Sequence, residues 1–370
     1  RSVTFHEGRL YFGGTKSRPS TIFGSRVSDF FNFDPGEALD DAAVEATLDT
    51  GTFNAIVDMY SGRHLQVFTT GGEFYVPQTL DDPITPSNLI VKAQTAFGIK
   101  AGVRVQNVDG STLFIQRQGK ALQEFVFSDT VQAYTSSKIS LLSSHLLRTP
   151  GEMAVRVATS TDEGDRLMIV NDDDGSIACY TLLRSQNVIA PCEWTTDGTF
   201  LNIGVDVDDI YVIVKRTVNS SDVYYVEVFD PDVFLDCAKT GTAAASVTMP
   251  HLEAQEVQII RDGIVEPAQT VAGSPSTVTF AVAATASFQV GLNFTPTIKT
   301  LPCEPNLSSG SLRGFKKRIF EINAELFETQ AMSINAKEIA FRNFGAGILD
   351  DDVEEYTGIK TLNGVLGYSY

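Results

Sequence analysis

The fold class of this chain is decided by the stretch Leu65-Gln66-Val67-Phe68-Thr69-Thr70-Gly71-Gly72-Glu73-Phe74-Tyr75-Val76. It consists of an apolar run, a polar turn with two glycines, and a second apolar run that is rich in aromatic residues. This pattern predicts a β-hairpin, because glycine accepts the backbone angles that a tight turn needs. The stretch therefore indicates a β-sheet protein.

The same strand–turn–strand unit occurs five times along the chain. The units are Arg9–Gly14, Leu65–Val76, Leu113–Phe125, Leu167–Tyr180 and Ile210–Val228, with turns at Gly14, Gly72, Gly119, Gly175 and Asn219. The turns recur roughly every 50 residues, which is close to the period of propeller blades. One blade cannot bury both of its faces alone, so neighbouring blades must pack against it. We expect a mainly β fold with a β-propeller-like domain over residues 1–240, and a pair of all-β sandwiches is the alternative.

Two further β regions are expected downstream. The segment 237–247 is small and polar and predicts a linker. Residues 248–303 predict a small inserted barrel or sandwich, in which Asp262-Gly263 is a strong hairpin signal. Another linker-like segment spans 302–314. Residues 316–327 then alternate apolar and polar side chains like a long half-buried strand, which makes 311–370 an elongated β region.

Helical signals are sparse. A turn or two is conceivable in 44–56, and 140–147 predicts one short helix.

Composition and charge exclude several functional classes. Apolar residues are 43% and charged residues 20% of the chain, which is typical of a folded globular protein. No apolar run has the roughly 18 residues that a membrane-spanning helix needs, and no signal peptide is recognisable. The net charge of −18 disfavours tight DNA binding, yet it suits the wall of a duct through which DNA passes without being held.

The sequence indicates no catalytic residue, metal site or cofactor. His6, His64, His145 and His251 are scattered and form no HExxH or HxH motif, so we expect them to be structural. Cys179, Cys192, Cys237 and Cys303 lack the spacing of metal ligands and are expected as free thiols in the core. Cys179 and Cys192 could face each other across a hairpin, although nothing in the sequence requires a disulfide.

The charged and aromatic runs have structural interpretations as well. Asn171-Asp172-Asp173-Asp174-Gly175 begins like a calcium-binding loop but has leucine at the twelfth position, so we expect a β-turn. The acidic run 350–355 predicts a solvated loop, or alternatively an electronegative collar. The cluster 316–318 predicts a strand start, or alternatively a contact to DNA or to an acidic partner. Phe30, Phe31 and Phe33 predict core or subunit contacts, with a sugar-stacking platform as the alternative.

Several motifs together carry a resemblance to a known family. They are His6–Ser25, Asp29–Phe33, Ser61–Leu65 with Thr70–Glu73, Ile84–Asn88, Phe114–Gly119 with Glu124-Phe125, and Lys337–Ile339 with Arg342–Gly345. In this order they resemble the tail tubular protein B, or nozzle, family of short-tailed bacteriophages. The resemblance spans nearly the whole chain.

The resemblance implies a virion structural protein and not an enzyme. The expected architecture is a β-propeller with the inserted module at 248–303 and a nozzle or platform region at 311–370, incomplete at its C-terminus because family members are longer at both ends. The expected partners are identical subunits in a ring, a hexamer, together with the tail adaptor or gatekeeper protein, tail fibres or tailspikes, and the genomic DNA that passes through the channel. The implied location is the virion tail, and the host cytoplasm during assembly.

Two other functions remain open from the sequence. A propeller at the tail tip could bind host glycans through exposed aromatic side chains. A hydrolytic propeller acting on surface sugars would need two carboxylates roughly 5 to 10 Å apart in a pocket. Self-assembly with symmetry would distinguish the ring from both.

Overall fold

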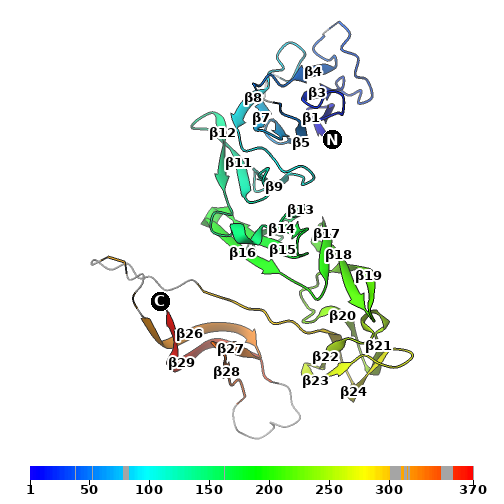
Figure 1. Cartoon of the computed structure of the whole chain (residues 1–370), viewed down its shortest axis with the longest axis vertical. Helices are drawn as coiled ribbons and strands as arrows, with labels where there is room; N and C mark the ends of the chain where they lie inside the picture. The colour runs from blue at the N-terminus through cyan, green and yellow to red at the C-terminus, as the bar shows by residue number, and fades with distance from the viewer. Residues whose placement is uncertain are drawn as a thin grey trace. The chain divides into compact units, whose positions relative to one another are not determined.

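The computed structural model describes the chain except for residues 38, 52, 78–82, 162, 301–309, 312–314, 316, 343–352 and 370. It divides into two compact units, Arg1–Asp230 and Pro231–Tyr370. Strands dominate both units (Figure 1). The helical segments of the described residues are short 3-10 turns: η1 Ser144–Leu146, η2 Arg184–Gln186 and η3 Pro250–Leu252. The expected mainly β fold is confirmed.

The first unit consists of five small antiparallel sheets, in each of which strands adjacent in the chain are adjacent in the sheet. The first sheet contains β1 Ser2–His6, β2 Arg9–Gly13, β3 Thr21–Gly24 and β4 Val44–Thr47; the second contains β5 Ile56–Ser61, β6 Leu65–Thr69, β7 Glu73–Val76 and β8 Lys92–Thr95. The third contains β9 Gln106–Val108, β10 Ser111–Ile115, β11 Leu122–Ser128 and β12 Ala133–Lys138. The fourth contains β13 Pro150–Arg156, β14 Asp165–Asn171, β15 Ile177–Leu183 and β16 Val188–Trp194, and the fifth contains β17 Thr199–Asp206, β18 Asp209–Val218 and β19 Ser221–Val228.

Each repeat predicted from the sequence is the connection between the second and third strands of one sheet. In the second sheet, Leu65 pairs with Val76 across the β6–β7 hairpin. The turn is closed by Thr69, whose Oγ1 accepts hydrogen bonds from the backbone N–H groups of Gly71 and Gly72. The turns at Gly119, Gly175 and Asn219 join the equivalent strands of the third, fourth and fifth sheets. The hairpin pattern therefore identified the second and third strands of each sheet, and the other strands gave no comparable signal.

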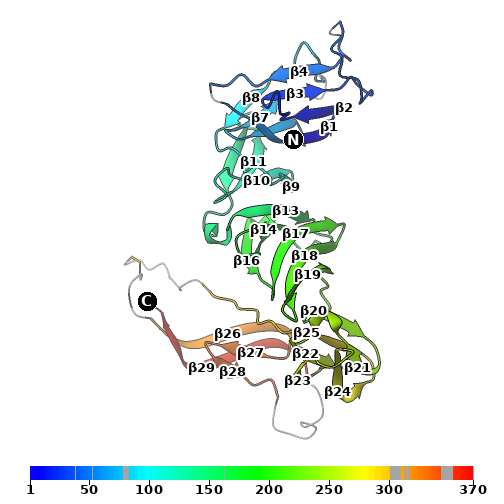
Figure 2. The same cartoon turned by 45° about the vertical axis from the view of Figure 1, so that its right-hand side comes forward.

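Neighbouring sheets are held together by the apolar side chains of these central strands. In β14, Leu167 and Ile169 belong to the core shared with the third sheet, whereas Met168 and Val170 belong to the core shared with the fifth. Side chains alternate between the two faces of a strand, so a run of apolar residues supplies both cores. Each fully buried side chain of this size contributes about 1.5–3 kcal/mol. Figures 1 and 2 show the first and fifth sheets at opposite ends of this unit.

The second unit begins with a small two-sheet module. Its strands are β20 Asp236–Gly241, β21 Ala244–Thr248, β22 Glu256–Arg261, β23 Ile264–Thr270, β24 Thr277–Ala284 and β25 Phe288–Leu292. The order in one sheet is β20-β25-β22-β23, and the other sheet is β21-β24. Both contribute to one apolar core that includes Val257, Val278 and Val290. The predicted hairpin at Asp262-Gly263 is confirmed, because Arg261 pairs with Ile264 across it.

The linker predicted at 237–247 is wrong, because β20 and most of β21 lie there. Its small residues allow close packing: a Cβ atom at Gly241 would lie 2.5 Å from the Phe288 ring. Gly291, opposite this strand in β25, is similarly close to Ala238. Glycine within a strand often marks such a close approach and not a flexible connection.

The last part of the second unit is a long two-stranded ribbon. It pairs β26 Lys317–Thr329 with β29 Tyr356–Ser369, and a short hairpin of β27 Met332–Ile334 and β28 Lys337–Ile339 lies between them in the chain. The alternation predicted for residues 316–327 is confirmed over the described strand β26, where half-buried and exposed side chains largely alternate.

The helical predictions were less accurate than the strand predictions. Residues 44–47 form strand β4, and the predicted helix over 140–147 is reduced to η1.

The turn at Gly175 offers a test of the packing between the fourth and fifth sheets. Gly175 has a φ angle of +66°, and an added Cβ would lie 2.5 Å from the Cβ of Thr199 in β17. In Gly175→Ala we expect a backbone cost of about 1–2 kcal/mol and an overpacking cost of about 1–3 kcal/mol, measured as the free energy of unfolding in urea. Gly110→Ala is the matched control, because Gly110 has a φ angle of +76° and no atom within 4 Å of the added Cβ. Equal destabilisation of the two variants would contradict this packing.

Candidate functional site

Three of the four histidines, His6, His64 and His251, make hydrogen-bond contacts within the fold, and His145 is exposed. The buried His6 in β1 shares a hydrogen bond of 2.8 Å with Ser61 Oγ in β5 and thereby connects the first two sheets. His64 Nδ1 lies 3.2 Å from Tyr134 Oη, between the second and third sheets. No group of three or more His, Cys, Asp or Glu side chains arranged for a metal ion occurs in the described parts of the chain.

The acidic run at 171–175 forms the predicted turn between β14 and β15. The carboxylate of Asp174 accepts hydrogen bonds from the backbone N–H and the hydroxyl of Ser176, and it forms an ion pair with Arg148. Together with Arg148, these hydrogen bonds hold the pKa of Asp174 below its ordinary value. Its oxygens are therefore engaged by the turn itself.

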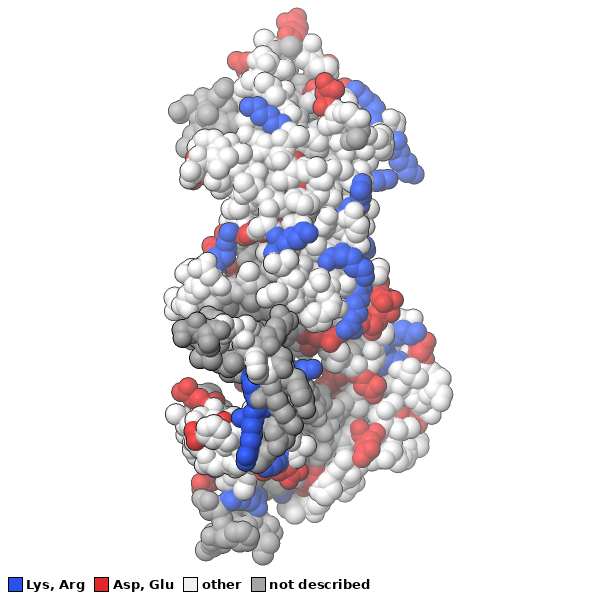
Figure 3. All heavy atoms as spheres, turned by 60° about the vertical axis from the view of Figure 1, so that its left-hand side comes forward, with Lys and Arg blue, Asp and Glu red and all other residues white. Residues whose placement is uncertain are grey.

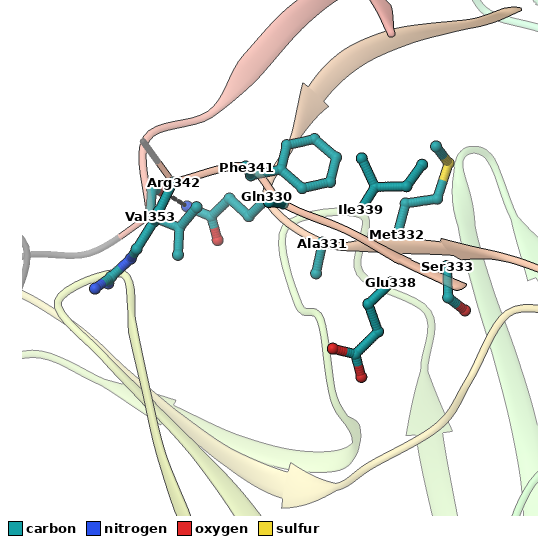
Figure 4. Close-up of a pocket in the computed structure, with 10 residues that line it drawn as sticks. Gln330, Ala331, Met332, Ser333, Glu338, Ile339, Phe341, Arg342 and Val353 are labelled. Carbon is teal, nitrogen blue, oxygen red and sulfur yellow. Dashed lines mark hydrogen bonds between the residues drawn. The ribbon is translucent and has the colours of Figure 1, made fainter. Parts of the chain in front are cut away.

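A hollow of about 470 Å³ lies at the β27–β28 hairpin (Figure 4). Ser333 and Glu338 are cross-strand neighbours in its wall. Gln330 donates a 2.9 Å hydrogen bond to the backbone oxygen of Val353. The described residues of its lining include one carboxylate, Glu338, and no histidine, so they do not supply the paired carboxylates of a glycosidase.

Glu73 is the first residue of β7, the third strand of the second sheet, and its carboxyl group is buried. Its side chain is fully buried, and it accepts hydrogen bonds from Thr95 Oγ1 and from the backbone N–H of Phe97. Burial raises the pKa of Glu73 and outweighs these hydrogen bonds, which lower it. Both partners belong to the segment that follows β7, so we interpret Glu73 as an anchor for that segment.

The most distinctive feature of the first sheet is an aromatic surface, defined here as Phe5, Phe12, Phe30, Phe31 and Phe33. Phe5 is 60% exposed and Phe31 is 93% exposed. Phe30 packs edge-on against Phe5 with ring centroids 5.1 Å apart, and Phe33 lies 5.5 Å from Phe12. The phenylalanines at 30, 31 and 33 are thus partly or fully exposed and not core residues, and the two other predicted roles, subunit contacts and a sugar-stacking platform, stay predictions.

The loop that carries this aromatic surface is held by a buried arginine. Arg9 in β2 is 1% exposed, and its guanidinium donates hydrogen bonds to the backbone oxygens of Ser25, Asp40 and Ala42. It therefore ties together both ends of the loop between β3 and β4. Desolvation lowers the pKa of Arg9, but an arginine remains charged at any physiological pH.

Within this loop, a tight turn presents the most exposed ring. Arg26 N–H donates to the backbone oxygen of Asn32, and Asp29 and Asn32 close two further backbone hydrogen bonds. Arg26 also forms an ion pair with Asp41. The turn holds Phe31 outward, so its exposure is a consequence of local structure.

A second apolar surface lies on the fifth sheet, at the other end of the first unit. The side chains of β18 and β19 that point away from the fourth sheet are large and exposed: Tyr211, Ile213, Tyr224, Val226 and Val228. We call this set the fifth-sheet face. Phe320, Phe327 and Ile359 on the ribbon of the second unit are more than 60% exposed as well. Exposed apolar patches of this kind typically mark sites of protein association.

Some predicted features lie outside the described residues. They are Lys316 of the basic cluster, residues 343–345 of the resembling motif, 350–352 of the acidic run, and Cys303. Of the other cysteines, Cys179 is buried as expected, whereas Cys192 is exposed, so the core assignment was wrong for Cys192.

Charged side chains of both signs occur on the face drawn in Figure 3, with uncharged side chains between them. No helix among the described residues has the length and apolarity needed to cross a membrane.

Comparisons with known proteins leave the function open. No protein family and no curated protein matches the chain. Among solved structures, a luciferin-regenerating enzyme aligns over 61% of this chain and 89% of its own, with 10% identity and a TM-score of 0.27. An exo-β-1,3-galactanase from Phanerochaete chrysosporium aligns over 78% and 90%, with 9% identity and a TM-score of 0.31. An exported protein from Bacteroides fragilis aligns over 58% and 64%, with 8% identity and a TM-score of 0.30. Similarities this weak carry no argument about activity.

The buried carboxyl of Glu73 predicts a specific pH dependence of stability. Because its pKa is raised in the folded chain, its contribution to stability is fully present below the unfolded pKa of about 4.3 and is lost as the pH rises through the folded pKa. We expect the free energy of unfolding of Glu73→Gln, measured in urea, to increase relative to that of the original chain as the pH is raised from 4 to 8. The exposed Glu37→Gln should show no such trend. If the difference in unfolding free energy between Glu73→Gln and the original chain is the same at every pH, the carboxyl group of Glu73 does not have a raised pKa in the folded chain.

Proposed function

We propose that this chain is a structural subunit of the tail nozzle or hub of a short-tailed bacteriophage and acts by assembly, not by catalysis. The proposal rests on two exposed apolar surfaces of the first unit. One is the aromatic surface on the first sheet, and the other is the fifth-sheet face. The motif resemblance supplies the phage context. Its proposed location is the virion tail, after assembly in the host cytoplasm.

The proposed assembly is a ring of identical subunits, a hexamer, formed by contacts between unlike surfaces. Within the first unit, successive sheets already pack face to face through apolar side chains. The aromatic surface and the fifth-sheet face would extend the same mode of packing between subunits or to the tail adaptor. The blade-like sheets are the elements of the proposed propeller.

The ribbon of the second unit supports the same proposal. A two-stranded sheet in water is marginally stable unless a further strand or layer covers it. The exposed Phe320, Phe327 and Ile359 on β26 and β29 would be covered in such an assembly. We propose that ribbons of several subunits together form the nozzle wall. The net charge of −18 would let DNA pass without being retained.

A glycan-binding role is the alternative, and the aromatic surface is the observation that favours it. Exposed phenylalanine rings can stack on sugar rings. The Arg26 and Asp41 side chains of the loop pair with each other. We favour the assembly contact because apolar side chains are exposed on the fifth sheet as well.

The test is the mass and symmetry of the protein alone and with the purified tail-adaptor complex, by light scattering and negative-stain images. We expect rings, and at least tenfold weaker assembly in Phe31→Ser, since burial of one phenylalanine contributes about 1.5–3 kcal/mol. Leu142→Ser is the matched control, because Leu142 is 87% exposed and lies outside the aromatic surface.

Two results would count against the ring. A protein that stays monomeric, does not bind the tail-adaptor complex and binds host polysaccharide would favour the glycan-binding alternative. Unchanged assembly of Phe31→Ser would exclude the aromatic surface as the contact.

A further inference from the structure

Two cysteines face each other across neighbouring strands of the fourth sheet. Cys179 in β15 is the direct antiparallel partner of Cys192 in β16. Directly opposed residues have Cα atoms about 4.5 or 5.5 Å apart, depending on the type of pair. Both spacings lie within the range of about 4.4–6.8 Å found in disulfides. Directly opposed residues of an antiparallel pair project from the same face of the sheet, so both thiol groups lie on one side of the β15–β16 pair.

The environments of the two thiols differ. Cys179 is 1% exposed and belongs to the core between the fourth and fifth sheets. Cys192 is exposed, on the edge strand of the sheet. The neighbouring Cys179 thiol lowers the pKa of Cys192 to about 7, aided by Trp194 and by the charge of Arg166. The neighbouring Cys192 and burial raise the pKa of Cys179.

We propose that Cys179 and Cys192 form a reversible thiol–disulfide site, in which Cys192 is the attacking thiol and Cys179 the resolving thiol. The inference stands on the cross-strand geometry and on the unequal access of the two sulfur atoms, and it is independent of the proposed tail function. It assigns a specific oxidation site within the first unit.

The oxidant in the proposed reaction is a small disulfide such as oxidised glutathione. The Cys192 thiolate attacks one sulfur of the oxidant, which forms a mixed disulfide and releases one glutathione thiolate. The Cys179 thiol then gives its proton to a released thiolate, and its sulfur attacks the sulfur of Cys192. The second glutathione leaves as a thiolate and is protonated from solvent. Two protein thiols are oxidised, and one small disulfide is reduced to two thiols.

The product would tie an edge strand to a buried one. β16 has neighbouring strands on one side only, and its side chains are exposed except for that of Trp194. The disulfide would enclose residues 180–191, which include the 3-10 turn between the strands. Closing this loop removes conformations from the unfolded segment and should suppress local opening of β16.

The experiment uses the full chain carrying Cys237→Ser and Cys303→Ser, equilibrated in buffers with graded ratios of oxidised to reduced glutathione. Peptide mass spectrometry should find Cys179 linked to Cys192 within one chain, and excess reductant should reverse the linkage. Amide hydrogen exchange of residues 188–194 should slow at least tenfold on oxidation. Adding Cys192→Ser to this background should abolish the linkage and the change in exchange rate, while the exposed position leaves folding intact.

Two outcomes would overturn the proposal. One is that both thiols still react with an alkylating reagent after equilibration with oxidised glutathione. The other is that Cys192 links only to a second chain or to glutathione, with Cys179 remaining reduced. Since these readouts require no assembly, failure of the ring would leave them unaffected.

Discussion

The structure of the first unit depends on the burial of both faces of each inner sheet. The four cores of this unit lie between successive sheets, and the central strands contribute to the core on either side. In β10, Leu113 and Ile115 face the fourth sheet, whereas Phe114 faces the second. A sheet removed from this order would expose two apolar faces. Within this unit the first and last sheets each have one neighbouring sheet, so one face of each has no second sheet of the unit packed on it, and Phe5 and Val226 are exposed there.

The sequence predicted the part of this arrangement that local patterns encode. Apolar runs around a glycine turn located the central hairpins, because strand pairing and turn chemistry act over a dozen residues. Alternation likewise located β26. The sequence could not show that Lys239-Thr240-Gly241 is a strand, because its small residues are required by Phe288, far along the chain. A linker and a closely packed strand have similar compositions, and only tertiary contacts distinguish them.

The same limit applies to the candidate site. Phe30 and Phe31 could be recognised as aromatic residues in a conspicuous motif, but the sequence did not show that their turn lies in a loop whose two ends Arg9 holds from β2. A buried arginine that binds three carbonyl groups has no signature in a linear sequence. The proposed phage context rests on the motifs alone. The fold adds exposed apolar surfaces suited to association, and the proposal of a structural role rests on this combination.

The edge strands of the fourth and fifth sheets, β16 and β19, differ in their sequences. Edge strands expose unpaired backbone groups, and proteins commonly protect them with proline or charge. β16 contains Pro191, which has no N–H group to offer a further strand. β19 is also an edge strand; it has no proline but carries the carboxylates of Asp222 and Glu227, and its outward side chains include Tyr224 and Val226. In a solitary protein such an edge, flanked by an apolar face, favours aggregation. In an assembly subunit a partner would cover the apolar fifth-sheet face, so we expect the proposed contact on the fifth sheet and not at the edge of the fourth, where Pro191 lies.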